Sequence, residues 1–130
     1  MRLDAEVERD SLVALGAEAV GLLCRGDIKT LAQRYGYALS HGREPATAIG
    51  DDLKRCLSQV GAAALAPAPE HPVRAVKFFE PNSSNLVAVV ECLVPTGNSA
   101  MLLVELIVSS KGAEKHITLE DITVEDAGVT

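Results

Sequence analysis

Two glutamates, Glu91 and Glu105, interrupt the most apolar stretches of the sequence and are its leading candidates for acid–base chemistry. The segment between these stretches, residues 95–100, is short enough to join two antiparallel strands in which the two side chains lie directly opposite each other. Like charges in that position repel, and a partly buried pair of carboxyl groups would hold only one proton. Such a pair could act as a general acid or base, with Glu91 as the candidate base.

The same glutamates have a second interpretation, as the solvated part of a sheet face that points away from the core. That face consists of odd-numbered positions, namely Val87, Val89, Glu91, Leu93, Met101, Leu103, Glu105 and Ile107. A monomer seldom exposes an apolar patch of this size, so the face is a candidate interface between two copies of the chain. We expect both glutamates at its wet margin. The expected apolar centre consists of Val89, Leu93, Leu103 and Ile107.

The histidines and cysteines do not have the spacing of a metal site or of an activated nucleophile. These residues are His41, His71, His116, Cys24, Cys56 and Cys92. No Cys-x-x-Cys or His-x-x-x-His pattern occurs, and we expect the cysteines to be reduced and buried among apolar neighbours. No glycine-rich phosphate loop or serine nucleophile elbow is present either. The sequence therefore predicts neither a metal nor a cofactor.

Composition narrows the class of protein and its partners. A chain of 130 residues that is 48% apolar forms one domain, residues 1–130, with a core that needs no metal or disulfide. Its net charge of −6, with no basic run, argues against nucleic acid and anionic membrane surfaces as partners. The start of the sequence lacks the basic and apolar pattern of an export signal, and no apolar stretch approaches the roughly 20 residues of a membrane helix. We expect a cytoplasmic protein.

Three helices are predicted over the first half of the chain, residues 4–61. Apolar residues recur at three- and four-residue spacing from Asp4 to about Cys24, which predicts the first helix. Asp27 is placed to cap the second helix, whose apolar stripe continues to Leu39. Pro45 suits the first turn of the third helix, and Gly61 is the expected stop. Residues 62–72 have no periodicity and contain prolines, so we expect a connector.

A four-stranded antiparallel sheet is predicted over residues 73–125, because the period of the apolar residues changes to two. The expected strands are Val73–Glu80, Leu86–Val94, Met101–Ser109 and Lys115–Glu125. Their connections are too short for crossover helices, so the strands form a meander. The even-numbered positions of the two central strands carry no polar side chain, and the helices must cover them. In the last strand, Glu120-Asp121 shifts the phase of the apolar positions, which indicates a β-bulge that bends the sheet.

Two short segments carry a family pattern. Residues Arg25–Ala32 consist of a basic residue, Gly-Asp, three further residues and Leu-Ala at the start of a helix. Residues Ile117–Val124 place an acidic pair between two pairs of apolar positions. In both, the chain resembles the cystatin-like superfamily of nuclear transport factor two-like and SnoaL-like proteins. The resemblance implies an α+β fold, a cystatin-like roll in which three N-terminal helices pack on a bent four-stranded antiparallel meander.

The resemblance also implies a cavity between the helices and the sheet, with the second helix at its mouth. Tyr35 continues the apolar stripe of that helix and Tyr37 points elsewhere, so one hydroxyl could bind a ligand, although packing alone explains both residues. The side chains expected to face the cavity are Tyr35, Tyr37, Asp51, Phe78 and Glu91. The expected occupant is a small apolar ligand.

Three classes of function follow from these patterns. The first is a non-catalytic binding or dimerisation module that forms a homodimer through its sheet. The second is a cofactor-independent isomerase, cyclase or dehydratase with a carboxylate base, as in some SnoaL-like proteins. The third is an acidic domain of the immunity type that binds a basic protein. Enzymes of the resembling group usually line their pocket with several aromatic residues. This chain has only two Tyr and two Phe, so an enzyme is the less favoured class.

Overall fold

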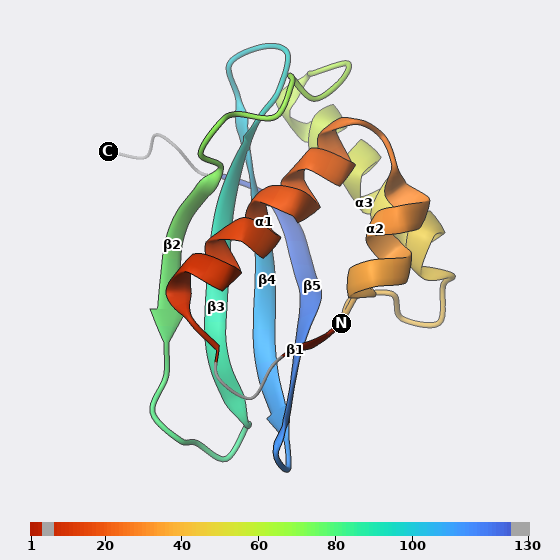
Figure 1. The fold of residues 1–130 in the computed structure, drawn as a ribbon. Coiled ribbons are helices and arrows are strands. Elements are labelled where there is room, and N and C mark those ends of the chain that lie inside the picture. The colour runs from red at the N-terminus through yellow and green to blue at the C-terminus, as the bar shows by residue number, and fades with distance from the viewer. Residues whose placement is uncertain (4–6, 126–130) are drawn as a thin grey trace.

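The first half of the chain is helical, as its periodicity predicts. The computed structural model describes residues 1–3 and 7–125. Within them, α1 spans Arg9–Cys24, α2 spans Ile28–Tyr35 and α3 spans Pro45–Val60 (Figure 1). The start predicted at Asp4 is not confirmed, because residues 4–6 lie outside the described part and residues 7 and 8 are not helical.

Helix α2 is shorter than its apolar stripe predicts. It ends at Tyr35 instead of Leu39, because Gly36 has a φ of +67°, a conformation that does not continue a helix. The predicted N-cap of α2 at Asp27 and the predicted end of α3 at Gly61 are both present. The backbone N–H of Thr30 donates to Asp27 Oδ1 at 3.4 Å, and Gly61 ends α3 in the left-handed conformation.

The second half of the chain forms an antiparallel sheet with one strand more than predicted. Its strands are β2 (Val73–Phe78), β3 (Leu86–Pro95), β4 (Met101–Lys111) and β5 (Glu114–Val124). The prediction of four strands is wrong because β1 (Arg2–Leu3) pairs with β5, which gives the order β1-β5-β4-β3-β2. Two residues are too few to show a period of two, and their pairing depends on a strand more than 100 positions away.

The three helices lie on one face of the sheet (Figure 1). The side chains beneath them are the even-numbered residues of β3 and β4, all at most 1% exposed: Ala88, Val90, Cys92, Val94, Leu102, Val104, Leu106 and Val108. Helix α1 packs closely here, since a Cβ atom on Gly16 would lie 2.7 Å from Val73 Cγ2. The predicted burial of the even-numbered face is therefore confirmed.

The predicted β-bulge in β5 is also present. Glu105 pairs with Asp121 while the next residue, Leu106, pairs with Leu119, so Glu120 is the extra residue. On either side of the bulge, Leu119 and Ile122 are both fully buried. The bulge thus keeps the apolar residues on the helix side while it turns two consecutive acidic residues toward the other side.

None of the described helices has both the length and the apolar character needed to cross a membrane.

Candidate functional site

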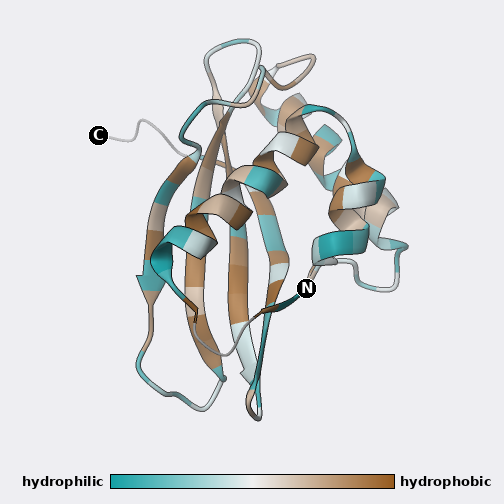
Figure 2. Ribbon diagram, in the orientation of Figure 1, coloured by the Kyte–Doolittle hydropathy of each residue, from teal (hydrophilic) through white to brown (hydrophobic). Residues whose placement is uncertain are grey.

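The face of the sheet opposite the helices carries the candidate site. Val89 pairs with Ile107 and Leu93 pairs with Leu103 across β3 and β4, so the four predicted interface residues lie together in two cross-strand pairs. All four are only half-buried, because no described helix packs on this side. In Figure 2, β3 and β4 are brown along most of their length, which reflects apolar residues on both of their faces.

A row of three carboxylates crosses the centre of this face. The predicted pairing of Glu91 with Glu105 is present, and Asp121 of β5 continues the row on the far side of Glu105. The bulge residue Glu120 adds a fourth carboxylate close to Glu105. The sequence-based prediction of two opposed glutamates was therefore correct but incomplete, because the bulge brings in two further acids.

The two glutamates differ in their partners. Glu91 Oε1 lies 3.5 Å from Arg74 Nη2, and Glu91 Oε2 lies 3.4 Å from Lys77 Nζ, both from β2. Glu105 has no ion pair with another described residue. Burial raises the pKa of Glu105, and repulsion from Glu91, Asp121 and Glu120 raises it further. The position of Glu105 among these carboxylates thus favours its neutral form.

The charges on this face are divided between its two sides. Arg74 and Lys77, which we call the basic margin, belong to β2, and both are exposed. Glu120 and Asp121, which we call the acidic margin, belong to β5 at the other side of the central strands. Arg74 also binds Glu125, with 2.6 Å between Arg74 Nη1 and Glu125 Oε1.

The five residues predicted to line a cavity under the helices do not come together. Glu91 lies on the opposite face of the sheet, so it does not enter the space between helices and sheet. Asp51 is exposed on α3, and Phe78 is 49% exposed at the end of β2. The alternation of side chains along a strand explains the position of Glu91, because its neighbours Val90 and Cys92 are the buried ones.

Tyr35 and Tyr37 are buried, and their hydroxyl groups are used within the chain. The Tyr35 hydroxyl donates to Glu18 Oε1 at 2.9 Å and lies 3.1 Å from the backbone oxygen of Leu15. The Tyr37 hydroxyl donates to Asp52 Oδ2 at 2.5 Å. Burial, followed by the bond to a carboxylate, raises the pKa of both tyrosines above the ordinary value. Packing therefore accounts for both residues.

Asp52 is a buried charged residue that was not among the predicted site residues. Only 6% of its side chain is exposed, and it accepts hydrogen bonds from Tyr37, from Arg43 Nη1 at 3.1 Å and from Arg55 Nη1 at 3.3 Å. Burial opposes its ionisation, but the bonds from Arg43 and Tyr37 outweigh burial and hold the pKa of Asp52 below its usual value. Asp52 is thus a satisfied structural charge.

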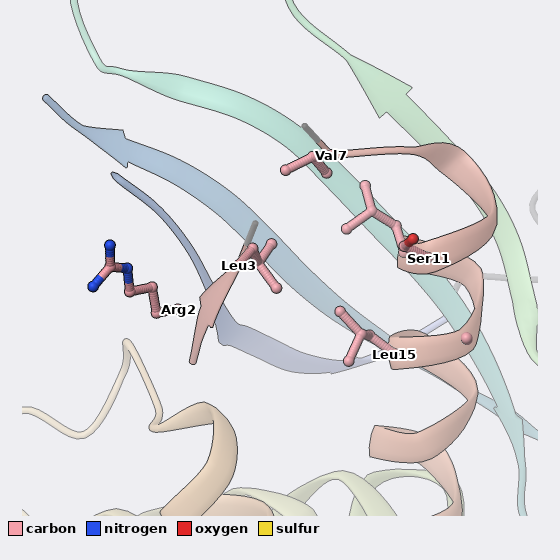
Figure 3. Close-up of a pocket in the computed structure, with 7 residues that line it drawn as sticks. Arg2, Leu3, Val7, Ser11 and Leu15 are labelled. Atoms are coloured by element: carbon pink, nitrogen blue, oxygen red, sulfur yellow. The ribbon is translucent and has the colours of Figure 1, made fainter. Parts of the chain in front are cut away.

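A groove lies between β1 and the first half of α1. It encloses about 380 Å³ and is lined by Arg2, Leu3, Val7, Ser11, Leu12, Ala14 and Leu15. Figure 3 shows Leu3 of β1 and Leu15 of α1 pointing into the same space. None of the five residues predicted for a ligand cavity belongs to this groove. The described residues of its lining are mainly apolar and include no carboxylate for acid–base chemistry.

The cysteines are free thiols, as predicted. Cys56 and Cys92 are buried, whereas Cys24 is only half-buried, so the predicted burial holds for two of the three. Burial raises the pKa of Cys92 to about 12, which keeps this thiol protonated at neutral pH. In the part of the chain that the structure describes, no group of three or more His, Cys, Asp or Glu side chains has a geometry that could hold a metal ion.

Comparisons with models of known protein families, with curated proteins and with solved structures gave no match. The function must therefore be argued from the geometry of the chain itself. The α+β arrangement of helices on an antiparallel sheet is established by the structure, whereas the cystatin-like assignment remains a prediction from the two short motifs. Of the sites described, the uncovered sheet face differs most from an ordinary solvated surface.

Proposed function

We propose that the chain is a non-catalytic α+β module that forms a homodimer through the uncovered face of its sheet. The observation that carries this proposal is the pair of apolar cross-strand contacts, Val89 with Ile107 and Leu93 with Leu103, at the centre of that face. Apolar side chains in two adjacent strands, with charged residues around them, are typical of an association surface. The order of helices and strands also supports a cystatin-like roll, which we include in the proposal.

The size of the face sets the expected strength of the dimer. Four strands about 4.8 Å apart and about eight residues long give a surface of roughly 500 Å² in projection. Stable complexes commonly bury about 800 Å² on each partner, and weaker ones bury less than about 600 Å². We therefore expect dissociation in the micromolar range rather than an obligate dimer.

The acid–base alternative has less support. Glu105 has the raised pKa that a general acid or base needs, but it lies on an open sheet face. A catalytic group must hold its substrate within hydrogen-bond reach, which is the role of a concave pocket. An immunity-type domain that binds a basic protein would use the carboxylate row, yet Arg74 and Lys77 already neutralise one end of that row. Self-association makes use of both the apolar pairs and the mixed charge.

Sedimentation equilibrium tests the proposal directly. We expect the wild-type chain to show twice its own mass at tens of micromolar, and Leu103→Asp to be a monomer because it places a charge in the apolar centre. Ala113→Asp, in the exposed turn between β4 and β5, is the matched control and should dimerise like the wild type. A wild-type chain that stays monomeric up to about 100 μM, well above the micromolar dissociation expected of an interface this small, would refute the proposed function.

A further inference from the structure

We infer a particular arrangement for this dimer: the two-fold axis runs along the strands, so that the basic margin of one copy lies over the acidic margin of its partner. The inference rests on the proposed dimerisation and adds the orientation of the second copy. The observation behind it is that basic and acidic side chains lie on opposite sides of the uncovered face. Arg74 and Lys77 are on β2, Glu120 and Asp121 are on β5, and the apolar strands β3 and β4 separate them.

Symmetry leaves two simple ways to stack the faces of two identical sheets. A two-fold axis along the strands exchanges the sides of the sheet and sets β2 over β5 of the partner. A two-fold axis across the strands keeps the sides and sets β2 over β2. In the second arrangement the basic margin of one copy lies over the basic margin of the other and the acidic margin over the acidic margin, and like charges across an interface are unfavourable. Only the first arrangement pairs opposite charges.

The first arrangement also fits the packing of sheets. Faces of stacked sheets lie about 10 Å apart with their strands within about 30° of each other. Long Arg and Lys side chains can cross that distance from the rim, where they also stay partly hydrated. At the centre, β3 lies over β4 of the partner, so Val89 and Leu93 meet Ile107 and Leu103. Both the apolar and the charged residues therefore find complementary partners.

The carboxylate row is compatible with this stacking. Glu91 of one copy lies over Glu105 of the other, but Glu91 is already neutralised by Arg74 and Lys77 within its own chain. Burial and the neighbouring carboxylates raise the pKa of Glu105, and closing the dimer over it favours the neutral form, which can donate to a carboxylate oxygen. The central acids thus need not repel each other.

Charge reversal within one chain tests the arrangement. Lys77→Glu and Glu120→Lys each place like charges of the two copies against each other, and symmetry repeats this contact twice per dimer. We expect each variant to raise the dissociation constant roughly tenfold. The combined variant Lys77→Glu/Glu120→Lys restores opposite charges, and its dissociation constant should return to within about threefold of wild type. Arg74 and Asp121 are left unchanged, because Arg74 binds both Glu91 and Glu125 and Asp121 accepts a bond from the backbone N–H of Ile122. Lys77 contacts Glu91 within its own chain, and Glu91 keeps Arg74 as a partner in every variant.

Two controls separate this inference from the proposed function. Lys54→Glu, on the exposed side of α3, makes the same charge change away from the face and should leave dimerisation unchanged. Thermal melts of all variants show whether each one is folded. If Leu103→Asp abolishes the dimer but both single reversals dimerise like the wild type, the dimer exists in another orientation and only this inference is overturned. Failure of the combined variant to recover, with a normal melt, overturns it as well.

Discussion

Asp52 is held by three donors from two parts of the chain. Tyr37 and Arg43 come from the segment after α2, and Arg55 comes from the next turn of α3. Because it joins that segment to α3, the carboxylate fixes the position of a stretch without regular secondary structure. A buried charge that loses one partner is costly, so the three contacts act as a unit.

Replacing Asp52 is expected to destabilise the fold strongly. Asp52→Ala leaves Arg43 and the Tyr37 hydroxyl without their acceptor, and we expect a loss of about 3 kcal/mol in the free energy of unfolding. Asp51→Ala, one position earlier and exposed, is the matched control and should cost less than about 0.5 kcal/mol. Urea denaturation compares the two. Equal losses would show that the buried cluster contributes nothing beyond an exposed helix position.

The lowered pKa of Asp52 predicts how the stability of the fold changes at acid pH. The pKa of Asp52 is lowered in the folded chain, so its stabilising contribution is complete above the unfolded carboxylate pKa. That contribution is lost as the pH falls through the lower, folded pKa. Asp52→Asn cannot ionise, and it should lose less stability than the wild type between about pH 5 and about pH 2. Parallel denaturation curves across that range provide the measurement. An identical acid dependence in both proteins would contradict the prediction.

At the level of single residues, the sequence analysis identified one feature of the site correctly and missed another. The opposition of Glu91 and Glu105 could be predicted, because a short connection between two alternating strands restricts the register. Asp52 had a usable signal, since it follows Ile49 by three positions and precedes Cys56 by four, which puts it on the apolar stripe. A charge at a stripe position indicates a buried network. Its partner Arg43 lies outside any periodic segment and could not be paired in advance.

Strand β3 allows a comparison of its two faces at adjacent positions. Val90 is fully buried under the helices, whereas Val89 is half-buried on the uncovered face. Val90→Ala should cost about 2 kcal/mol because it leaves a cavity in a packed core, and Val89→Ala should cost less than about 1 kcal/mol in the monomer. Denaturation at a protein concentration well below the dimer dissociation constant separates the two. The opposite order would mean that the helices cover the other face.

The elements themselves could be predicted to different extents. The boundaries of α3 and of strands β3 to β5 agree with the prediction within a few residues, and α1 ends at Cys24 as predicted. The C-terminal limit of α2 was placed too late, because the apolar stripe continues past Gly36 although the backbone does not. Strand β1 could not be found, since it consists of two residues and forms by pairing with β5. Local pattern identifies long elements, whereas short ones depend on contacts distant in the sequence.

The whole molecule should dimerise more strongly as the pH falls. Burial in a dimer favours the neutral form of Glu105, whose pKa is already raised, so association takes up a proton. The charged groups around it are Glu91 on β3, Glu120 and Asp121 on β5, and the basic margin on β2. We expect the dissociation constant to decrease steadily from about pH 7.5 to about pH 5.5.

Glu105→Gln is the control for this pH dependence. Gln has the same shape and no charge, so the variant should dimerise at neutral pH as strongly as the wild type does in mild acid. If Glu105→Gln keeps the full pH dependence of the wild type, the proton is taken up elsewhere and the role of Glu105 is refuted.

The two edges of the sheet limit how far an assembly of this chain can grow. On β5, the backbone N–H of Ile117 donates to Met1 and the backbone oxygen of Leu119 accepts from Ala38, and the bulge at Glu120 follows directly. On β2, a strand of only six residues, the outermost side chains include Arg74 and Lys77. Covered backbone, a bulge and charged side chains all hinder the addition of a further strand. Edge-to-edge polymerisation into fibrils is therefore disfavoured, and association through the face ends at two copies.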